Sequence, residues 1–255
     1  MKHGDFTALA GDYACYRPGY APTVVTAILA LVGRPPAEID AADVGAGTGI
    51  FTRMLAARGL HSVTAVEPND EMRRQGILAS QDMNIRWEKG TGEATERASQ
   101  SFDLVSMASS FHWVQFDAGC REFQRILRQG GRFVALWNPR LIEVNPLLVE
   151  IESEITRLKP DIRRVSSGRS GLTERLTDML CSKAGFDDIV YFEGRHVARQ
   201  SPEQYLGAWR SVNDLQVQLG PELFGQFLSH VERKIAGVSS IETTYLTRAW
   251  SARRV

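Results

Sequence analysis

Apolar residues along the chain alternate between short continuous runs and runs spaced every three to four residues. The short runs predict strands, which we expect at residues 39–44, 63–66, 85–88, 102–108, 132–137, 189–193 and 243–251. Helical spacing predicts helices at residues 22–32, 50–58, 69 onwards, 117–127 and 172–184, and a largely helical stretch at 201–237. Strands and helices that alternate in this way form a parallel sheet covered on both faces.

A glycine-rich segment, Asp43-Val44-Gly45-Ala46-Gly47-Thr48-Gly49, joins the first predicted strand to the next helix. Glycines at such a junction let the backbone turn sharply and approach a ligand closely. A nicotinamide dinucleotide loop needs the spacing GxGxxG or GxGxxA. This chain fails both, because Ile50 or Thr52 stands at the last required position. A tight turn without a ligand is the simpler alternative.

The spacing DxGxGxG resembles the signature of class I S-adenosylmethionine-dependent methyltransferases. The resemblance extends to Val66-Glu67-Pro68, since an acidic residue at the end of the second strand can accept hydrogen bonds from both ribose hydroxyls. Residues 90–93 and 101–105 are similar to the segment that contacts the adenine, although many relatives have an aspartate where this chain has Thr91. Residues 127–131 also resemble the family.

The resemblance implies S-adenosyl-L-methionine as the cofactor and a doubly wound, Rossmann-like α/β fold. In that fold a mostly parallel seven-stranded sheet has an antiparallel last strand, and helical insertions form a lid. We expect a single methyltransferase domain over residues 1–255. It divides into an N-terminal lid and first helix (1–34), a cofactor-binding core (35–137) and substrate-facing insertions (138–171 and 199–238), since ligands bind beyond the carboxyl ends of the strands.

Two aromatic segments are similar to the small-molecule branch that includes trans-aconitate methyltransferase. They are Phe111-His112-Trp113 and the N-terminal residues Tyr13, Tyr16, Arg17, Pro18 and Tyr20. In that branch the N-terminal segment folds over the cofactor, which implies that Arg17 pairs with the methionine carboxylate. The alternative is that these tyrosines pack on the edge of the sheet.

The resemblance therefore implies a set of cofactor-binding residues: Tyr16, Arg17, Asp43, Gly45, Ala46, Gly47, Thr48, Gly49, Glu67, Pro68, Met72, Gly92, Glu93, Ser109 and Phe111.

Four residues near the predicted strand ends are candidates for substrate binding: His112, Trp113, Arg140 and Trp209. His112 is also the candidate catalytic residue, because a general base there would remove a proton from the methyl acceptor. It could equally shape the cofactor pocket, and a carboxylate acceptor would need no base. Arg140 could bind an anion or be a surface cation, and Trp209 could line the pocket or belong to the core.

Composition and residue spacing narrow the classes of substrate, metal site and location that the protein can have. Thirty basic residues balance thirty acidic ones, which argues against a nucleic-acid substrate. The three cysteines, Cys15, Cys120 and Cys181, and the five histidines have no metal-site spacing. No apolar run approaches the roughly 20 residues of a membrane span, and the N-terminus lacks the apolar core of a signal peptide.

We therefore expect a cytoplasmic monomer or homodimer that methylates an O, N or C atom of a small molecule by in-line displacement, without metal or membrane. The alternatives are an RNA methyltransferase and a non-catalytic protein that binds S-adenosylmethionine.

Overall fold

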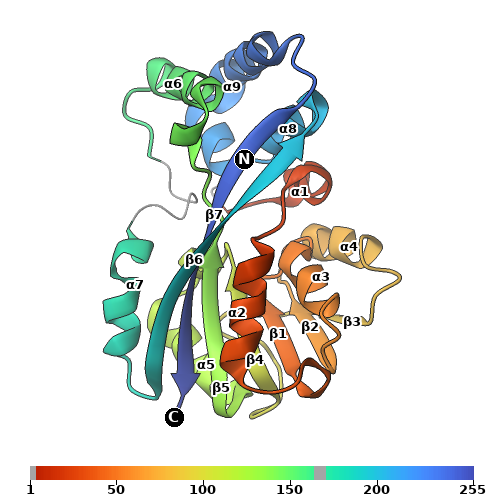
Figure 1. Ribbon diagram of the computed structural model, residues 1–255, viewed down its shortest axis with the longest axis vertical. Helices are drawn as coiled ribbons and strands as arrows, with labels where there is room; N and C mark the ends of the chain where they lie inside the picture. The colour runs from red at the N-terminus through yellow and green to blue at the C-terminus, as the bar shows by residue number, and fades with distance from the viewer. Residues whose placement is uncertain (1–3, 164–170) are drawn as a thin grey trace.

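The computed structural model describes residues 4–163 and 171–255, which form a central seven-stranded sheet with helices on both faces (Figure 1). The strand order is β3-β2-β1-β4-β5-β7-β6. The first five strands in this order are parallel, whereas β7 is antiparallel to both of its neighbours. The strands are β1 Asp40–Val44, β2 Ser62–Val66, β3 Ile85–Glu88, β4 Phe102–Ala108, β5 Leu127–Trp137, β6 Phe186–Gln200 and β7 Ile241–Arg254. The predicted fold class is confirmed.

Two clusters of buried apolar residues hold the covering helices against the two faces of the sheet. Helices α2 and α3 pack on one face with Val25, Ile28 and Leu55, and α5 and α7 pack on the other with Phe123 and Leu180. The α-helices are α1 Ala10–Tyr16, α2 Pro22–Val32, α3 Ile50–Ala56, α4 Asp70–Leu78, α5 Phe116–Ile126, α6 Pro146–Leu158, α7 Leu172–Cys181, α8 Pro202–Arg210 and α9 Asn213–Ile235. Short 3₁₀ turns are η1 Thr7–Leu9, η2 Pro36–Glu38, η3 Phe111–Trp113 and η4 Ile142–Val144.

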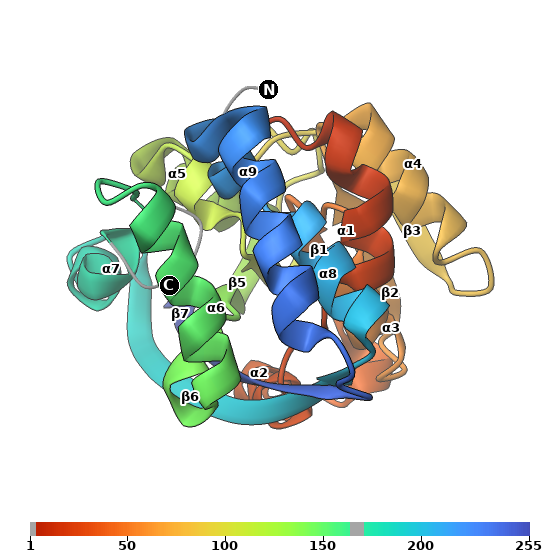
Figure 2. The same cartoon turned by 90° about the horizontal axis from the view of Figure 1, so that it is seen from above.

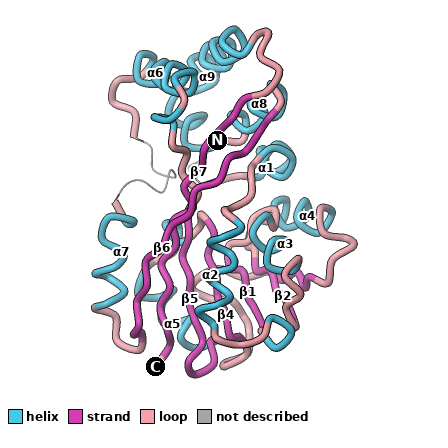
Figure 3. Tube along the Cα trace, in the orientation of Figure 1, coloured by secondary structure: helices cyan, strands magenta, loops and turns pink. Residues whose placement is uncertain are grey.

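A third apolar cluster joins α6, α8 and α9 beyond the sheet. Strands β6 and β7 continue past the other strands to reach this helical layer (Figure 3). Seen from above, α9 lies between α6 and α8, with α1 beside α8 (Figure 2). The helical layer therefore stands over one end of the sheet.

Several predicted boundaries are wrong. Strand β6 is much longer than the predicted 189–193, because its outer half pairs with β7 through residues that are mostly exposed or half-buried. Strand β7 extends the predicted 243–251 by two residues at its start and three at its end. Strand β5 begins at Leu127, before the expected turn at Gly130. Helix α5 begins at Phe116, and its cap is the Gln115 side chain, which accepts a hydrogen bond from the Ala118 N–H, rather than Asp117.

The two insertions contain more structure than their composition suggested. Residues 138–163 include α6, which buries Leu148, Ile151 and Ile155, while residues 164–170 lie outside the described residues. The expected helical stretch is two helices, α8 and α9, and α9 is interrupted at Gly220, where φ is 71°. Helix α1 precedes the helix that we expected to be first. Within the described ranges, we find no helix with the length and apolarity needed to cross a membrane.

Candidate functional site

The glycine-rich loop follows β1 and leads directly into α3. Gly45, Gly47 and Gly49 all have positive φ, at 64°, 59° and 76°, so each needs the freedom of a residue without Cβ. A Cβ at Gly45 would lie 2.8 Å from the Ser110 side chain, and one at Gly49 would lie 2.8 Å from the Trp87 ring. At Gly47 the nearest atom would be Met72 Cε at 3.3 Å. Gly47 is therefore the least crowded of the three glycines, and it lines a cavity.

This cavity has a volume of about 310 Å³ and lies at the carboxyl ends of β1, β2 and β4. Ten of the predicted site residues line it: Gly45, Ala46, Gly47, Glu67, Pro68, Met72, Gly92, Glu93, Ser109 and Trp113. The remaining predicted site residues lie outside its lining.

Glu67, at the end of β2, places a buried carboxylate in the cavity wall. Its Oε2 accepts a hydrogen bond from the Gly47 N–H at 2.7 Å, and its Oε1 accepts one from the Asn69 N–H at 2.9 Å. Burial raises the pKa of Glu67 above its ordinary value. Asn69 then caps α4 by accepting from the backbone N–H groups of Glu71 and Met72. The carboxylate thus fixes two pocket loops and presents its remaining lone pairs as acceptors.

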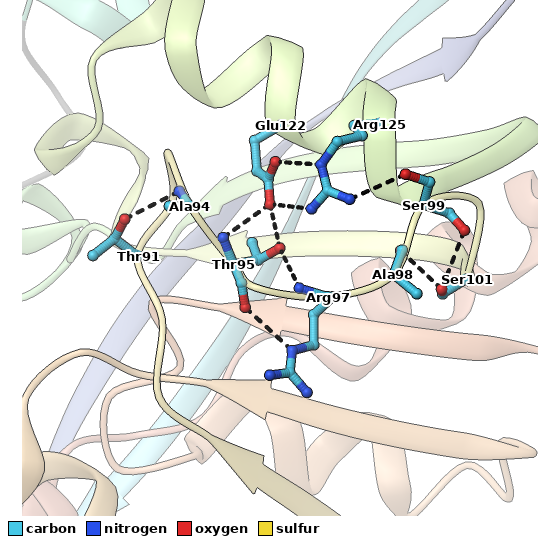
Figure 4. A network of polar contacts seen from close by, with 9 residues as sticks. All are labelled: Thr91, Ala94, Thr95, Arg97, Ala98, Ser99, Ser101, Glu122 and Arg125. Carbon is cyan, nitrogen blue, oxygen red and sulfur yellow. Dashed lines mark hydrogen bonds and ion pairs between the residues drawn. The ribbon is translucent and has the colours of Figure 1, made fainter.

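The loop that carries Thr91, Gly92 and Glu93 is anchored from behind by α5 (Figure 4). The Glu122 carboxylate accepts hydrogen bonds from the Thr95 N–H at 2.9 Å and from the Thr95 hydroxyl, and Arg125 forms a bidentate pair with it. Glu122 is buried. No sequence motif identified it, although its (i, i+3) spacing from Arg125 is a weak sign of a paired carboxylate.

Asp43 begins the glycine motif, but its side chain does not line the cavity. It is fully buried and accepts hydrogen bonds from Thr52 Oγ1 at 2.6 Å and Ser106 Oγ at 2.8 Å. Burial raises the pKa of Asp43 to about 6. The carboxylate therefore links β1 to α3 and β4, and it supports the glycine loop without facing the cavity.

Three more of the predicted cofactor-binding residues are buried or turned away. Thr48 is buried, and its hydroxyl finds no hydrogen-bond partner in the described part of the chain. Gly49 faces the Trp87 ring. Phe111 packs into the apolar core, with its ring 5.0 Å from that of Phe133.

Tyr16 and Arg17 contact the helical layer. Arg17 Nε donates to the Ser211 hydroxyl at 2.7 Å, at the end of α8, and its guanidinium lies 5.1 Å from the centre of the Tyr13 ring. The Tyr16 hydroxyl lies 3.5 Å from Glu203 Oε1. Neither side chain lines the cavity, so their contact with the cofactor stays a prediction.

Twelve lining residues were not among the predicted site residues: Gly4, Phe6, Tyr13, Tyr20, Ile50, Phe51, Asn69, Thr91, Met107, Ala108, Ser110 and Val114. Of these, Tyr13, Tyr20 and Thr91 lie in segments that the resemblance placed near the cofactor. The aromatic residues of the N-terminal segment were the available signal. Tyr20 is buried, and its hydroxyl shares a hydrogen bond of 2.9 Å with the Ser109 hydroxyl.

Arg140 is mostly buried and stacks on Trp209 at the helical layer. The Arg140 guanidinium lies 3.9 Å from the centre of the Trp209 ring and 3.2 Å from the Glu152 carboxylate. Trp209 is fully buried. The alternative that Arg140 is a surface cation is therefore wrong, and Trp209 does belong to a core, that of the third cluster.

Residues 42–135 match the family model described as "Methyltransferase domain". This range holds the glycine loop, Glu67 and the loop anchored by Glu122. This part of the chain is therefore similar to a methyltransferase domain. It contains the motifs that resemble those of class I methyltransferases, and that resemblance implies S-adenosylmethionine as the cofactor.

Known proteins are similar over different shares of the chain. An uncharacterized methyltransferase of Mycobacterium tuberculosis is 36% identical over 135 residues, which are 53% of this chain and 52% of that protein. The match thus spans about half the length of this relative. An uncharacterized methyltransferase of Schizosaccharomyces pombe is 28% identical over 249 residues, 96% of this chain and 94% of that one.

Among solved structures, the putative type II methyltransferase of Anaeromyxobacter dehalogenans has the same fold. Its TM-score is 0.65 at 20% identity, and the match covers 93% of this chain and 98% of that one. The similarity includes the helical layer as well as the sheet.

Replacing the buried carboxylate of the cavity wall tests its role. We expect Glu67→Ala to weaken binding of S-adenosylhomocysteine by about 2–3 kcal/mol, the size of charge-assisted hydrogen bonds, as measured by calorimetry. Asp70→Ala removes an exposed carboxylate three residues away and should leave the dissociation constant unchanged. Equal dissociation constants for wild type and Glu67→Ala would show that the ribose is bound elsewhere.

Proposed function

We propose that this protein transfers the methyl group of S-adenosylmethionine to a small-molecule acceptor by in-line displacement. The observation that carries the proposal is the cavity in which the open backbone of Gly47 faces the buried carboxylate of Glu67. A glycine backbone without steric cover and an acceptor for hydroxyls suit an adenosyl ligand.

The residues present fit the cofactor. Glu67 would accept from the ribose hydroxyls, the loop at Gly92 and Glu93 would contact the adenine, and Gly47 would let the ligand approach the backbone. Arg17 is the residue proposed for the methionine carboxylate, and it would have to exchange its bond to Ser211 for that contact.

The bound cofactor supplies an already activated methyl group on a sulfonium. The work left to the chain is to align the acceptor with the methyl and to exclude water. The aromatic residues Phe6, Tyr13 and Trp113 close one side of the cavity. Ring faces attract cations, so these three side chains would suit the positive charge of a bound sulfonium.

The net charge of the protein and the segments that stand over the cavity both support a small-molecule acceptor. The formal net charge is zero, whereas binding of a nucleic-acid backbone needs a basic surface. The N-terminal segment and the helical layer stand over the cavity end of the sheet (Figure 2), which favours a compact acceptor over a polymer.

Binding and turnover test this proposal separately. We expect calorimetry to show binding of S-adenosylhomocysteine and no binding of NAD, because the loop lacks the dinucleotide spacing. We then expect S-adenosylhomocysteine to form with a small molecule from a panel of carboxylates, phenols, amines and enolisable ketones, and not with total RNA. Binding of NAD alone would overturn the cofactor. Turnover on RNA that falls steeply with salt would overturn the acceptor class.

A further inference from the structure

Two hydroxyl groups meet in the wall of the cavity, those of Tyr20 and Ser109. Ser109 directly follows β4, and Tyr20 lies just before α2 in the N-terminal segment. The two oxygens lie 2.9 Å apart, so one hydroxyl donates a hydrogen bond to the other. Two hydroxyls have two hydrogens, and this bond uses one of them. Within the described residues neither hydroxyl makes a further hydrogen bond, so the pair retains one O–H donor.

Hydrogen bonds on both sides of Tyr20 fix its backbone. Asn138 Nδ2 donates to the Gly19 carbonyl at 2.9 Å, and the Ala21 N–H donates to Thr247 Oγ1 at 2.8 Å. Thr247 Oγ1 in turn donates to Asn138 Oδ1 at 2.7 Å. These three bonds link the end of β5 and the middle of β7 to the segment that carries the tyrosine. The phenol is therefore held in place before any ligand binds.

Ser109 has a backbone conformation that residues other than glycine rarely adopt, with φ of +55°. Its N–H donates to the Leu136 carbonyl of β5 at 2.7 Å, and the hydroxyl of Ser110 donates to the Val44 carbonyl of β1 at 3.2 Å. Both bonds hold the turn after β4 against its neighbouring strands. Strain that surrounding contacts maintain in this way is common at functional sites.

Ser109 is the member of the pair that a ligand can reach. Tyr20 is only 8% exposed, whereas Ser109 is half-buried. Burial raises the pKa of the Tyr20 phenol above its ordinary value, so the phenol keeps its proton. If the serine were the donor, this buried phenol hydrogen would have no acceptor, which folded proteins avoid. Tyr20 therefore donates to Ser109 Oγ, and the serine hydrogen is left for the cavity.

The sheet order places this hydroxyl at the end of the cavity opposite Glu67. Strand β1 lies between β2 and β4, so the glycine loop after β1 separates Glu67, after β2, from Ser109, after β4. A cofactor with its ribose at Glu67 and its chain along the glycine loop would carry its sulfonium toward β4. The methyl acceptor has to approach the methyl group in line with the carbon–sulfur bond, which places it beside Ser109.

The predicted general base lies near this end of the cavity but outside its lining. His112 is part of η3, and its Nδ1 accepts a hydrogen bond from Trp137 Nε1 at 3.2 Å. Ser109, by contrast, is a lining residue. A ligand in the cavity therefore meets the Ser109 hydroxyl directly, while a general-base role for His112 stays a prediction.

We propose that the Ser109 hydroxyl donates a hydrogen bond to the methyl acceptor and thereby selects among acceptors, and that Tyr20 is a positioning residue that orients this hydroxyl. The inference rests on the methyl transfer proposed above. It also moves Ser109 from the predicted cofactor-binding residues to those that contact the acceptor.

The class of acceptor follows from the direction of this hydrogen bond. The attacking lone pair forms the new bond to the methyl carbon as the carbon–sulfur bond breaks, and the sulfur keeps the electron pair of the broken bond. A hydrogen bond to that same lone pair would compete with the attack. The acceptor therefore has a second lone pair, on the attacking oxygen or on an oxygen or nitrogen beside the attacking atom. Ser109 gives up no proton in this step.

Two variants without the serine hydroxyl separate hydrogen bonding from backbone strain. Ser109→Ala keeps a Cβ at φ of +55°, whereas Ser109→Gly adopts this conformation without strain. Each should raise KM for an acceptor found in the panel roughly fivefold to tenfold, the effect of one hydrogen bond, with kcat within about twofold of wild type. Ser182→Ala removes an exposed hydroxyl outside the cavity lining and should have wild-type kinetics.

A double variant tests whether Tyr20 acts through Ser109. Tyr20→Phe should raise KM less than Ser109→Ala does, because the serine hydroxyl remains but loses its orientation. The double variant should match Ser109→Ala alone, since nothing is left to orient. Effects that multiply would mean that the two hydroxyls contact the ligand independently, which overturns the positioning role. Circular dichroism melting checks that each variant folds.

Calorimetry with S-adenosylhomocysteine shows whether Ser109 contacts the acceptor or the cofactor. This compound contains the cofactor's amino-acid part and no acceptor, so Ser109→Ala and Ser109→Gly should bind it like wild type. A loss of roughly tenfold in both variants would assign the hydroxyl to the cofactor and overturn the inference. Wild-type KM in Ser109→Gly would assign the effect of Ser109→Ala to strain and overturn it as well.

Turnover by the wild type distinguishes this inference from the proposed function. If the wild type methylates no member of the panel, the proposed function fails and this inference fails with it. If the wild type is active while Ser109→Ala has unchanged kinetics, only the inference is overturned. The same holds if the acceptor proves to be a simple amine, which has a single lone pair and no neighbouring oxygen or nitrogen.

Discussion

Gly47→Val should abolish detectable binding of S-adenosylhomocysteine while the protein still folds. A valine here would direct its branched side chain into the cavity, because the only atom near the added Cβ is Met72 Cε at 3.3 Å. The branch would occupy space that the ligand needs. We expect a loss of at least about 2.7 kcal/mol, or 100-fold in affinity, measured by calorimetry.

Backbone strain is the competing explanation, since φ at Gly47 is +59° and branched residues avoid this region. Gly59→Val is the matched control. Gly59 has φ of +71° and open space around its added Cβ, but it lies outside the cavity lining. We expect Gly59→Val to lose stability and to keep its affinity for the ligand. If Gly59→Val loses as much affinity as Gly47→Val, strain accounts for both and the loop does not face the ligand.

The sequence predicted the parallel half of the sheet well. Strand β4 is buried along almost its whole length, and five of its seven residues are apolar, so it stands out from the flanking helices. The glycine loop was also predictable, because positive φ restricts Gly45, Gly47 and Gly49 to one residue type. These signals are local, and local signals can be found in a single sequence.

What escaped prediction depends on contacts distant in sequence. The outer half of β6 alternates between exposed and half-buried residues, and only its pairing with β7, about fifty residues later, makes it a strand. Helix α6 buries Leu148 and Ile151 against α9, and nothing in its own segment reveals that partner. The polar appearance of such segments reflects their exposed faces.

In the candidate site, too, local motifs were predictable and contacts between distant residues were not. Glu67 and the glycines were found because their roles follow from position in the motif, and the structure places them around one cavity. The orientation of a side chain was not predictable. Asp43 belongs to the same motif, yet its carboxylate bonds to Thr52 and Ser106 beneath the loop. Glu122 supports the pocket from α5 and appears in no motif.

The N-terminal segment is held over the cavity by contacts that its composition did not suggest. The Gly4 N–H donates to Asn213 Oδ1 at 3.0 Å, and Asn213 Nδ2 donates to the Asp5 carbonyl at 2.8 Å. On the core side, Asn69 Nδ2 donates to Thr7 Oγ1 at 3.0 Å. The segment thus bridges α9 and the start of α4, and α1 lies between α8 and α4 (Figure 1). We propose that it is a lid.

Deleting residues 1–20 should therefore remove nearly all turnover and much of the cofactor affinity, because Phe6, Tyr13 and Tyr20 line the cavity and an open site admits water. The sheet and its two apolar faces do not depend on these residues, apart from Tyr20, so the truncated protein should fold. In the intact protein, S-adenosylhomocysteine should slow hydrogen exchange of the amides in residues 7–16. Unchanged exchange with saturating ligand would mean that the segment only packs against the helices.

A finer test displaces the lid without removing it. A Cβ on Gly207 in α8 would lie 2.2 Å from Tyr16 Cδ2, so Gly207→Ala should push α1 away from α8 while favouring the helix by about 1 kcal/mol. Gly225→Ala makes the same change in α9, where nothing lies within 4 Å of the added Cβ. We expect Gly207→Ala to bind S-adenosylhomocysteine roughly tenfold more weakly and Gly225→Ala to bind it like wild type. Equal affinities for the two variants would show that the contact between α1 and α8 does not hold the ligand, because both helices gain the same propensity and only the Cβ added at Gly207 meets α1.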